Sequence, residues 1–470
     1  MPLMPVILWT DALVFLLIAL GVGFALYARR HEHLRAPWRR VMGSRVGVAS
    51  LVILSFYVLV GLLDTVHFRL RLSDQQPGME TQFAPEVLSL LDVLLRPLRD
   101  SQEKTYSAPF ATHLFVKEAV AQPDGTLIRD FPRLSHGGSH LEDPGQRGRD
   151  ILRLSLWGTI QGLAAWGLLG LILCWLLARR RGRTLREMIY QVRQGHTEVP
   201  WRAALITLLV MLLLAFAAAN LALQYHILGT DKVGEDVFYQ ALKSIRTGLI
   251  IGTLTTLVML PAAILLGIMA GYFRGWVDDI IQYLYTTLNS IPGVLLIAAA
   301  ILMLQVYMSN NAERFESLVE RADLRLLFLC LILGVTSWTG LCRLLRGDAL
   351  KLRESDYVQA AAGLGVGHFV IISRHILPNV LHIVMITLVL DFSGLVLAEA
   401  VLSYVNIGVD PTMNSWGNMI NSSRLELARE PVVWWSLAAA FLFMFALVLT
   451  ANLFADVVRD AFDPRLRGVR

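Results

Sequence analysis

The sequence predicts an all-α polytopic membrane protein with one small α+β insert outside the membrane. Its composition points to this class, because 55% of the 470 residues are hydrophobic and only 17% are charged, whereas soluble domains are about a quarter charged. The apolar residues also gather in runs that reach the ~20 residues needed to cross a bilayer as a helix. Helices are expected because backbone groups in lipid must find their hydrogen bonds within the segment.

About nine transmembrane helices follow from these runs. We expect them at residues 10–28, 46–66, 153–178, 203–223, 248–270, 281–308, 325–346, 379–404 and 432–455. The later spans are interrupted by glycine, proline and polar residues, which are tolerated at membrane depth where the chain faces protein or water. Transporters are commonly built in this way.

The basic residues predict the orientation of the chain. The loops "ARRHEHLRAPWRR" and "ARRRGRTLREMIYQVRQ" carry most of the arginines, so the positive-inside rule places both in the cytoplasm. Alternation then puts the N-terminus outside and the Arg-rich C-terminus inside. The net charge of +5 comes from such loops and is no sign of a nucleic-acid partner. No basic residue precedes the first span, so we interpret it as an anchor and not as a secretory signal.

Residues 67–150 are polar and fall outside by the same alternation. The stretch "FAPEVLSLLDVLLRPLRD" predicts a helix, and "LFVKEAVAQPDGTLIRDF" predicts two strands joined by a turn at Pro123, Asp124 and Gly125. The segment "HGGSHLEDPGQRGRD" reads as a flexible return to the membrane. We therefore expect a small folded cap. One face of its helix would carry the leucines Leu88, Leu91, Leu95 and Leu98.

No catalytic or metal-binding pattern is convincing. The chain has no P-loop, and the glycines of "GLGVGHF" do not follow a strand as a dinucleotide site requires. His368, His375 and His382 are seven residues apart, about 10 Å along a helix, which is too far to share one ion. His136 and His140 are only a weak candidate. The cysteines fall in predicted spans, where we interpret them as apolar packing residues; they are Cys174, Cys330 and Cys342.

The stretch "DYVQAAAGLGVGHFVIISRHILPN", residues 356–379, lies in a predicted cytoplasmic loop. Apolar and small residues recur at helical spacing before three glycines, and a second amphipathic turn follows. Pro378 then occupies a favourable first-turn position of the next span. We expect a short helix, a bend at Gly365 and a second short helix along the membrane surface. The alternative is an ordinary interfacial helix.

The same stretch resembles the signature of ABC-importer permeases. Ala360, Ala361, Gly365, Leu377 and Pro378 match that signature, while Gln359 replaces its usual glutamate and His375 takes an isoleucine position. Six further stretches resemble the dipeptide, oligopeptide and nickel branch, and they keep family order. They are "LGTDKVGEDV", where Glu235 replaces an arginine, "AGYFRGWVDDIIQ", "SIPGVLLIAAAI", "LAEAVLSYVNIGV", "PTMNSWGNMI" and "VVRDAFDPRLR".

The resemblance covers about 228–470, and "APWRRVMGSRVGVASLVIL" adds the family's N-terminal span. It implies a type I ABC importer permease fold with additions. The expected parts are an extra helix and basic loop at 1–37, the family N-terminal helix at 38–66, the extracytoplasmic insert at 67–150, two extra helices at 151–223, and the permease core at 224–470 with its coupling loop at 352–377.

By this resemblance the chain is one of two permease subunits, the C-type, of an importer in the bacterial inner membrane. Its implied partners are a homologous permease, two cytoplasmic ATPases, an extracytoplasmic substrate-binding protein and membrane lipid. ATP and Mg²⁺ would bind the ATPases, so this chain is expected to hold no cofactor or metal and to have no catalytic residues. It would move peptides by alternating access, a population shift driven from the ATPases.

Two groups of functional residues are expected, the first implied by the resemblance and the second by the residues themselves. The ATPase-coupling residues would be Tyr357, Gln359, Ala360, Ala361, Leu364, Gly365, His375 and Pro378. The pathway or gate candidates are Asn289, Pro292, Asp391 and Glu399. Asp391 and Glu399 are included because ionised groups in a span are costly and usually face water or a partner; the alternative is that they form helix–helix hydrogen bonds. Two alternative functions stay open: an importer of nickel or another small solute, and a membrane sensor or scaffold that reads a signal through its cap.

Overall fold

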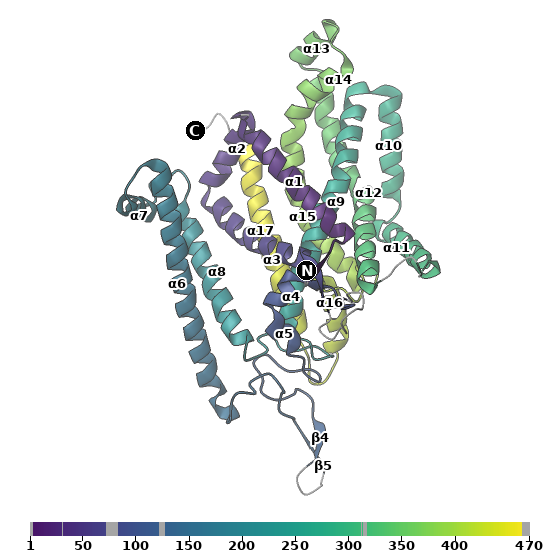
Figure 1. The fold of residues 1–470 in the computed structure, drawn as a ribbon. Coiled ribbons are helices and arrows are strands. Elements are labelled where there is room, and N and C mark those ends of the chain that lie inside the picture. Colours follow the sequence, from purple (N-terminus) through teal and green to yellow (C-terminus); the bar gives the residue numbers. More distant parts are fainter. Residues whose placement is uncertain are drawn as a thin grey trace, which may run out of the picture. The chain divides into compact units, whose positions relative to one another are not determined.

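The computed structural model describes residues 3–30, 32–71, 83–121, 127–311, 313 and 317–462. Within these residues, nine helices are long and apolar enough to cross a membrane, which confirms the predicted fold class (Figure 1). They are contained in α1 (Trp9–Arg30), α3 (Arg45–Thr65), α6 (Arg147–Arg181), α8 (Trp201–Ala222), α9 (Val237–Phe273), α11 (Gly293–Asn310), α12 (Leu318–Arg353), α15 (Leu377–Tyr404) and α17 (Trp435–Phe462).

The chain forms two compact units. The first unit comprises Met1–Val6, Arg39–Thr247 and Asn414–Thr450. The second comprises Ile7–Trp38, Gly248–Met413 and Ala451–Arg470. The insert and the two extra helices after it belong to the first unit, and the glycine-rich loop at 352–377 belongs to the second.

The continuous span predicted at 281–308 is wrong. The chain instead forms α10 (Gly275–Ser290) and then α11, with Ile291 in an extended conformation between them. Pro292 explains the break, because proline lacks the N–H that a helix interior needs and disfavours helical geometry in the residue before it. Only α11 is apolar and long enough to count among the nine.

A three-stranded antiparallel sheet in the first unit was not predicted. Its order is β1 (Leu3–Val6), β2 (His67–Leu70) and β3 (Leu88–Ser89). Leu3 lies opposite Leu70, so the start of the chain pairs with the segment that leaves α3. Two spans separate β1 from β2 along the sequence, which returns the chain to the same side of the membrane.

The insert is folded, as the sequence predicted, but its helix is divided. Three of the four leucines are buried, yet Leu88 belongs to β3, and α4 (Leu90–Leu94) and α5 (Arg96–Asp100) are separate helices. The predicted hairpin is confirmed as β4 (Glu118–Ala121) and β5 (Leu127–Asp130). Its expected turn at 123–125 lies outside the described residues.

Part of the segment 136–150, expected to be a flexible return, packs closely: Gly137 and Gly138 are buried, whereas residues 139–149 are mostly exposed. A Cβ added at Gly137 would lie 3.1 Å from the ring of His226, and one at Gly138 would lie 3.2 Å from the ring of Tyr225. Glycine is therefore required here by close approach to neighbouring side chains. Its abundance in the sequence had suggested flexibility.

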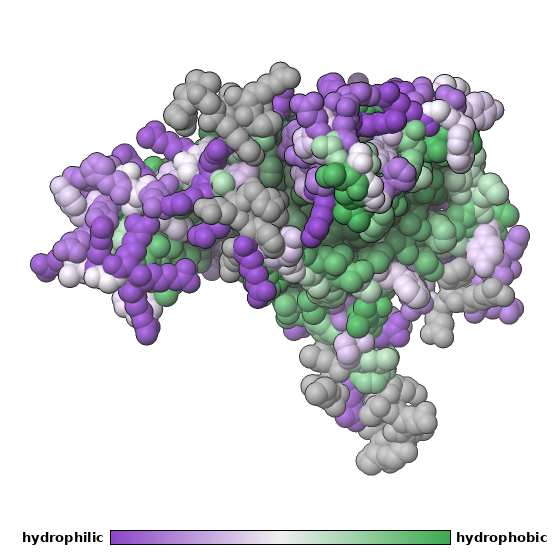
Figure 2. Space-filling model, turned by 90° about the horizontal axis from the view of Figure 1, so that it is seen from above, coloured by the Kyte–Doolittle hydropathy of each residue, from purple (hydrophilic) through white to green (hydrophobic). Residues whose placement is uncertain are grey.

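The helices α6 and α8 form an antiparallel hairpin in the first unit, and α7 (Leu185–Gln194) lies at one end of it (Figure 1). Thr184 and Glu187 form a capping box that begins α7. Met188 and Val192 then pack against α6, next to Cys174 and Ala178. Viewed from this end, the surface over α7 is mostly hydrophilic, as expected of an amphipathic helix at a membrane surface (Figure 2).

The second unit is built around α9, α12 and α15, whose buried side chains form its main core clusters. The N-terminal helix α1 packs on α12, and the backbone N–H of Thr10 donates to Asp323 Oδ2 at 3.1 Å. The α2 helix (Glu32–Gly43) follows, and its Trp38 ring meets Phe462 edge-on with 5.7 Å between centroids. The added N-terminal segment is therefore part of this unit's packing.

The crossing of α6 and α8 gives a first testable prediction. A Cβ at Gly158 would lie 2.7 Å from Ala217 Cα, whereas a Cβ at Gly167 meets no atom within 4 Å. Gly158→Ala should therefore force the helices apart and cost about 1–3 kcal/mol. Gly167→Ala should be neutral or slightly stabilising, since alanine favours helix by up to ~1 kcal/mol. The thermal unfolding midpoint of the purified protein measures both; equal midpoints would contradict the close crossing.

Candidate functional site

The glycine-rich loop has the helix–bend–helix form that the sequence predicts. After α12, α13 (Asp356–Gly363) forms a short helix, and Gly365 turns the chain with a φ of +77°. The chain continues as α14 (His368–Ile371) and the π-helical turn η3 (Ile372–Ile376) before α15 begins. In Figure 1 this loop extends beyond the ends of α12 and α15.

The inner face of the loop is fixed by packing. Val358 and Ile376 are buried in the same core cluster as residues of α9, α12 and α15. The outer face, meaning the exposed residues of the loop, includes two large apolar side chains, since Leu364 is 84% and Phe369 81% accessible. Large apolar side chains that remain exposed on a loop with a packed inner face mark a candidate interaction surface.

Most of the predicted coupling residues are accessible at the surface of the loop. Tyr357, Gln359, Ala360, Leu364, Gly365 and Pro378 are exposed, and His375 is half-buried. Ala361 is different, because it is 9% exposed and belongs to the core cluster. It can support the outer face by packing, but it does not offer a contact surface.

Polar contacts join the loop to the end of α9. Arg353 Nη1 donates to the carbonyl of Tyr272 at 2.9 Å, and Arg274 pairs with Glu354 at 2.5 Å. The Tyr272 hydroxyl lies 2.8 Å from His368 Nδ1. A force on the loop would therefore reach α9 as well as α12 and α15. Sequence reasoning missed these residues, although Tyr272 and Arg274 lie within the "AGYFRGWVDDIIQ" stretch.

The four pathway candidates lie at three helices of the second unit, α10, α11 and α15. Asn289 is at the end of α10 and accepts a hydrogen bond from Thr339 of α12 at 3.1 Å, and Pro292 begins the next helix. Asp391 and Glu399 lie on α15. Asp391 is half-buried, and Glu399 is 2% exposed and accepts from Ser403 Oγ at 2.7 Å. Glu399 is thus positioned within the protein, while Asp391 is nearer a surface.

The histidines considered as metal ligands have other partners. His382 Nδ1 lies 2.7 Å from the carbonyl of Asn379, and His140 Nε2 lies 2.8 Å from Asp150. The ring nitrogen Nδ1 of His136 lies 3.9 Å from the Glu103 carboxylate. In the described parts of the chain, no group of three or more His, Cys, Asp or Glu side chains is arranged to hold a metal.

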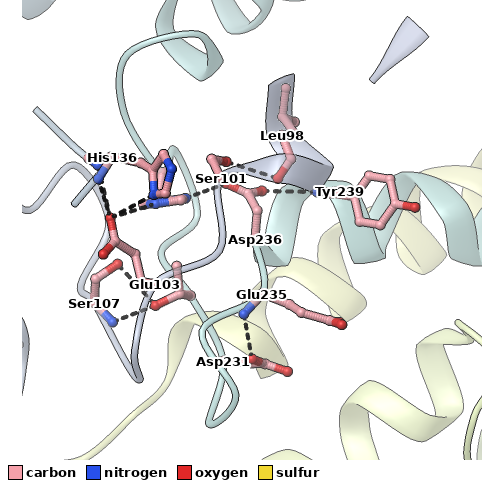
Figure 3. Close-up of polar contacts among 12 residues, drawn as sticks. Leu98, Ser101, Glu103, Ser107, His136, Asp231, Glu235, Asp236 and Tyr239 are labelled. Atoms are coloured by element: carbon pink, nitrogen blue, oxygen red, sulfur yellow. Dashed lines mark hydrogen bonds and ion pairs between the residues drawn. The ribbon is translucent and has the colours of Figure 1, made fainter. Parts of the chain in front are cut away.

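A second polar site lies in the first unit, where the insert meets the "LGTDKVGEDV" segment (Figure 3). The Glu103 carboxylate accepts backbone N–H bonds from Ser135, His136 and Gly137 at 2.9, 2.7 and 3.1 Å. His226 bridges to the segment, because its Nδ1 lies 2.7 Å from Asp236 and its Nε2 lies 3.5 Å from Glu103. Asp236 also accepts the N–H of Tyr239 in the first turn of α9 at 3.0 Å.

The glycines of that segment are required by the insert. Gly229 and Gly234 have φ values of +69° and +81°. A Cβ at Gly234 would clash with the backbone of Glu103, and one at Gly229 would lie 3.0 Å from the Trp435 ring. Thr230 completes the junction by accepting the N–H of Ser107 at 2.7 Å. The insert and the segment therefore fold as one structure.

An ion cluster strengthens the same region. Lys243 of α9 lies 2.6 Å from Asp64 at the end of α3 and 2.9 Å from Asp92 of the insert. Asp92 also accepts from the Tyr239 hydroxyl at 2.7 Å. No short motif in the sequence could reveal these contacts, because they join residues far apart in the chain.

The charges of the Glu103 cluster are mutually stabilised. Burial alone would lower the pKa of His226, but its interactions with Asp236 and Glu103 outweigh burial and raise the pKa to about 9. Burial alone would raise the pKa of Glu103, but His226 and the three N–H donors lower the pKa to about 2. Near neutral pH the junction thus holds a protonated histidine between two carboxylates.

Comparisons with known proteins agree with the motifs. A family model described as "Binding-protein-dependent transport system inner membrane component" matches residues 263–468. A glutathione transport system permease protein from Pectobacterium atrosepticum is 31% identical over 245 residues, 52% of this chain and 74% of the relative. An oligopeptide transport system permease protein from Mycobacterium bovis is 31% identical, over 52% of this chain and 78% of the relative. A dipeptide transport system permease protein from Lactococcus lactis is 30% identical, over 51% of this chain and 64% of the relative.

The His226 cluster predicts a defined pH dependence. The folded pKa of His226 lies above its ordinary value of 6.5, so its contribution to stability is complete below pH 6.5 and is lost as the pH rises through about 9. For Glu103 the folded pKa lies below 4.5, so its contribution is complete above pH 4.5 and is lost as the pH falls through about 2. The junction should be most stable between these limits, at pH 4.5–6.5.

His226→Gln tests this dependence. The substitution leaves two buried carboxylates without their cation, which should cost about 3–5 kcal/mol. The difference in thermal unfolding between variant and wild type should be largest at pH 6 and should shrink by pH 9.5. His113→Gln, at an exposed histidine of the same insert, is the control and should change little. A difference that stayed constant with pH would contradict the charged junction.

Proposed function

This chain belongs to the family of binding-protein-dependent transport system inner membrane components, so it is a multi-pass membrane permease of an ABC importer, and we propose that its cargo is peptides. The relatives reported above are named as permeases for glutathione, dipeptides and oligopeptides. All three cargoes are short peptides, which supports the proposal over a metal or another small solute.

The coupling mechanism is proposed to depend on the exposed surface around Leu364 and Phe369. We propose that this surface docks on a cytoplasmic ATPase and that the contacts of Arg353 and His368 with Tyr272 transmit ATPase closure to α9, α12 and α15. Bond chemistry would stay with ATP and Mg²⁺ on two such ATPases. A second permease subunit would complete the pathway, and an extracytoplasmic binding protein would deliver the peptide.

The pathway itself is proposed to involve the interrupted region of the core. The break at Pro292, with Asn289 beside it, provides backbone and side-chain polar groups within an otherwise apolar stretch. Asp391 is the second pathway candidate, because no hydrogen bond within the described residues accounts for its half-buried carboxyl. Glu399 accepts from Ser403 and is proposed as a support for the outer gate.

The insert is proposed to face the binding protein. The Glu103 junction fixes it to the segment that leads into α9, so an insert that contacts a binding protein could pass a signal directly into the permease core. The orientation that this requires has the N-terminus and the insert outside and the C-terminus in the cytoplasm. The arginine-rich loops and the pairing of β1 with β2 support it.

Gly365→Asp tests the coupling role. Aspartate would strain a bend at φ +77° and add a charge to the docking surface, although no atom lies within 4 Å of the added Cβ. Uptake of a labelled dipeptide or of glutathione by the reconstituted transporter should fall more than tenfold, about 1.4 kcal/mol of coupling, while the protein still inserts. Gly195→Asp is a matched control, because Gly195 has a φ of +76° and equally open surroundings. Normal peptide-stimulated ATP hydrolysis in Gly365→Asp would overturn the coupling role.

Reporter fusions test the orientation. Fusions after Arg40, within the insert at Asp124 and after Arg470 should read cytoplasmic, external and cytoplasmic, because the flanking arginines are retained inside. Each reporter is compared in both an external-active and a cytoplasmic-active form. An external reading at Arg40 would refute the proposed topology.

A further inference from the structure

An apolar groove of about 680 Å³ opens between α6, α7 and α8 in the first unit. Its walls include Trp166 and Leu171 of α6, Ile189 of α7 and Leu205 of α8. The indole N–H of Trp166 already donates to the Leu205 carbonyl at 2.8 Å, so the ring offers only its apolar surface to the groove. The described walls therefore favour a hydrocarbon occupant.

Two pairs of glycines on α6 shape the groove: one pair allows close contact with α8, and the other leaves open space. Gly158 and Gly162 let α6 approach α8 closely. A Cβ added at either glycine would lie within 3.2 Å of backbone atoms of α8. Nearer to α7, a Cβ at Gly167 would meet nothing within 4 Å, and one at Gly170 would meet only Leu205 at 3.8 Å. The helices are thus in close contact at one end and leave open space at the other.

The end of the groove nearest α7 is positively charged. Arg193 of α7 and Arg202 of α8 line it, and both are exposed. Within the described part of the chain, neither guanidinium has an acidic partner within ion-pair distance. Arginine binds phosphate well because its planar fork donates two parallel hydrogen bonds. Two arginines beside an apolar groove thus match the charge and polarity of a lipid with an anionic headgroup.

We propose that this groove binds one anionic phospholipid, with an acyl chain along Gly167 and Gly170 and the phosphate between Arg193 and Arg202. With the orientation proposed above, the lipid belongs to the cytoplasmic leaflet, where anionic headgroups attract basic segments. The bound lipid would brace α7 against the α6–α8 hairpin. This is a role for the two extra helices that is separate from peptide transport.

Native mass spectrometry of the full purified chain tests the proposal. The protein is incubated with palmitoyl-oleoyl phosphatidylglycerol or with the matching phosphatidylcholine, and retained lipid is counted. Wild type should keep one phosphatidylglycerol at least fivefold better than phosphatidylcholine. Arg193→Gln with Arg202→Gln should lose this preference, and Gly167→Leu with Gly170→Leu should lose the bound lipid by filling the groove. Millimolar inorganic phosphate should not displace it.

The matched control is Arg183→Gln with Arg186→Gln, which removes the same charge from exposed arginines in α7 and just before it, outside the groove lining. It should retain phosphatidylglycerol as wild type does. If this control lost phosphatidylglycerol equally, the preference would come from the general positive charge of the region and not from the groove, which would overturn the proposal. Equal retention of both lipids by wild type, unchanged retention in the groove-filled variant, or displacement by phosphate would each overturn the proposal. Thermal unfolding of every variant confirms that it is folded.

Discussion

Polar groups inside a membrane protein must find partners within the protein, and this constraint explains most of the arrangement. In the second unit, Arg346 of α12 donates two hydrogen bonds to Asp278 of α10 at 2.6 and 2.7 Å, and Thr10 bonds Asp323. In the first unit, Lys243 pairs with two aspartates. Each pairing satisfies a buried or half-buried charge or dipole, and each fixes one helix against another.

Exposed apolar side chains complement this pattern. On α6 and α8 they cover most of the helix surface, which is expected where lipid is the solvent. Leu364 and Phe369 differ, because they lie on a short loop beyond the ends of the spans and above a packed inner face. Their exposure suits a protein partner, and we propose that this partner is an ATPase.

Local patterns in the sequence predicted the spans, the hairpin of the insert and the bend at Gly365, since each depends on neighbouring residues. The single span at 281–308 failed because apolar content outweighed Pro292, whose missing N–H ends α10. Sequence reasoning also missed β1, whose partner lies beyond two spans. The Glu103 junction was equally hidden, because its donors and His226 come from distant segments. Ala361 matched a family motif, yet only packing could place it in the core.

Site-specific photo-crosslinking tests the central claim most directly. Benzoylphenylalanine at Phe369, a residue 81% exposed on the loop, should form an adduct with the ATPase in the assembled transporter, and ATP binding should change its yield. The same probe at Phe131, a residue 42% exposed on the insert, should give no ATPase adduct. An ATPase adduct from Phe131, or none from Phe369 in a transporter that hydrolyses ATP, would contradict the account.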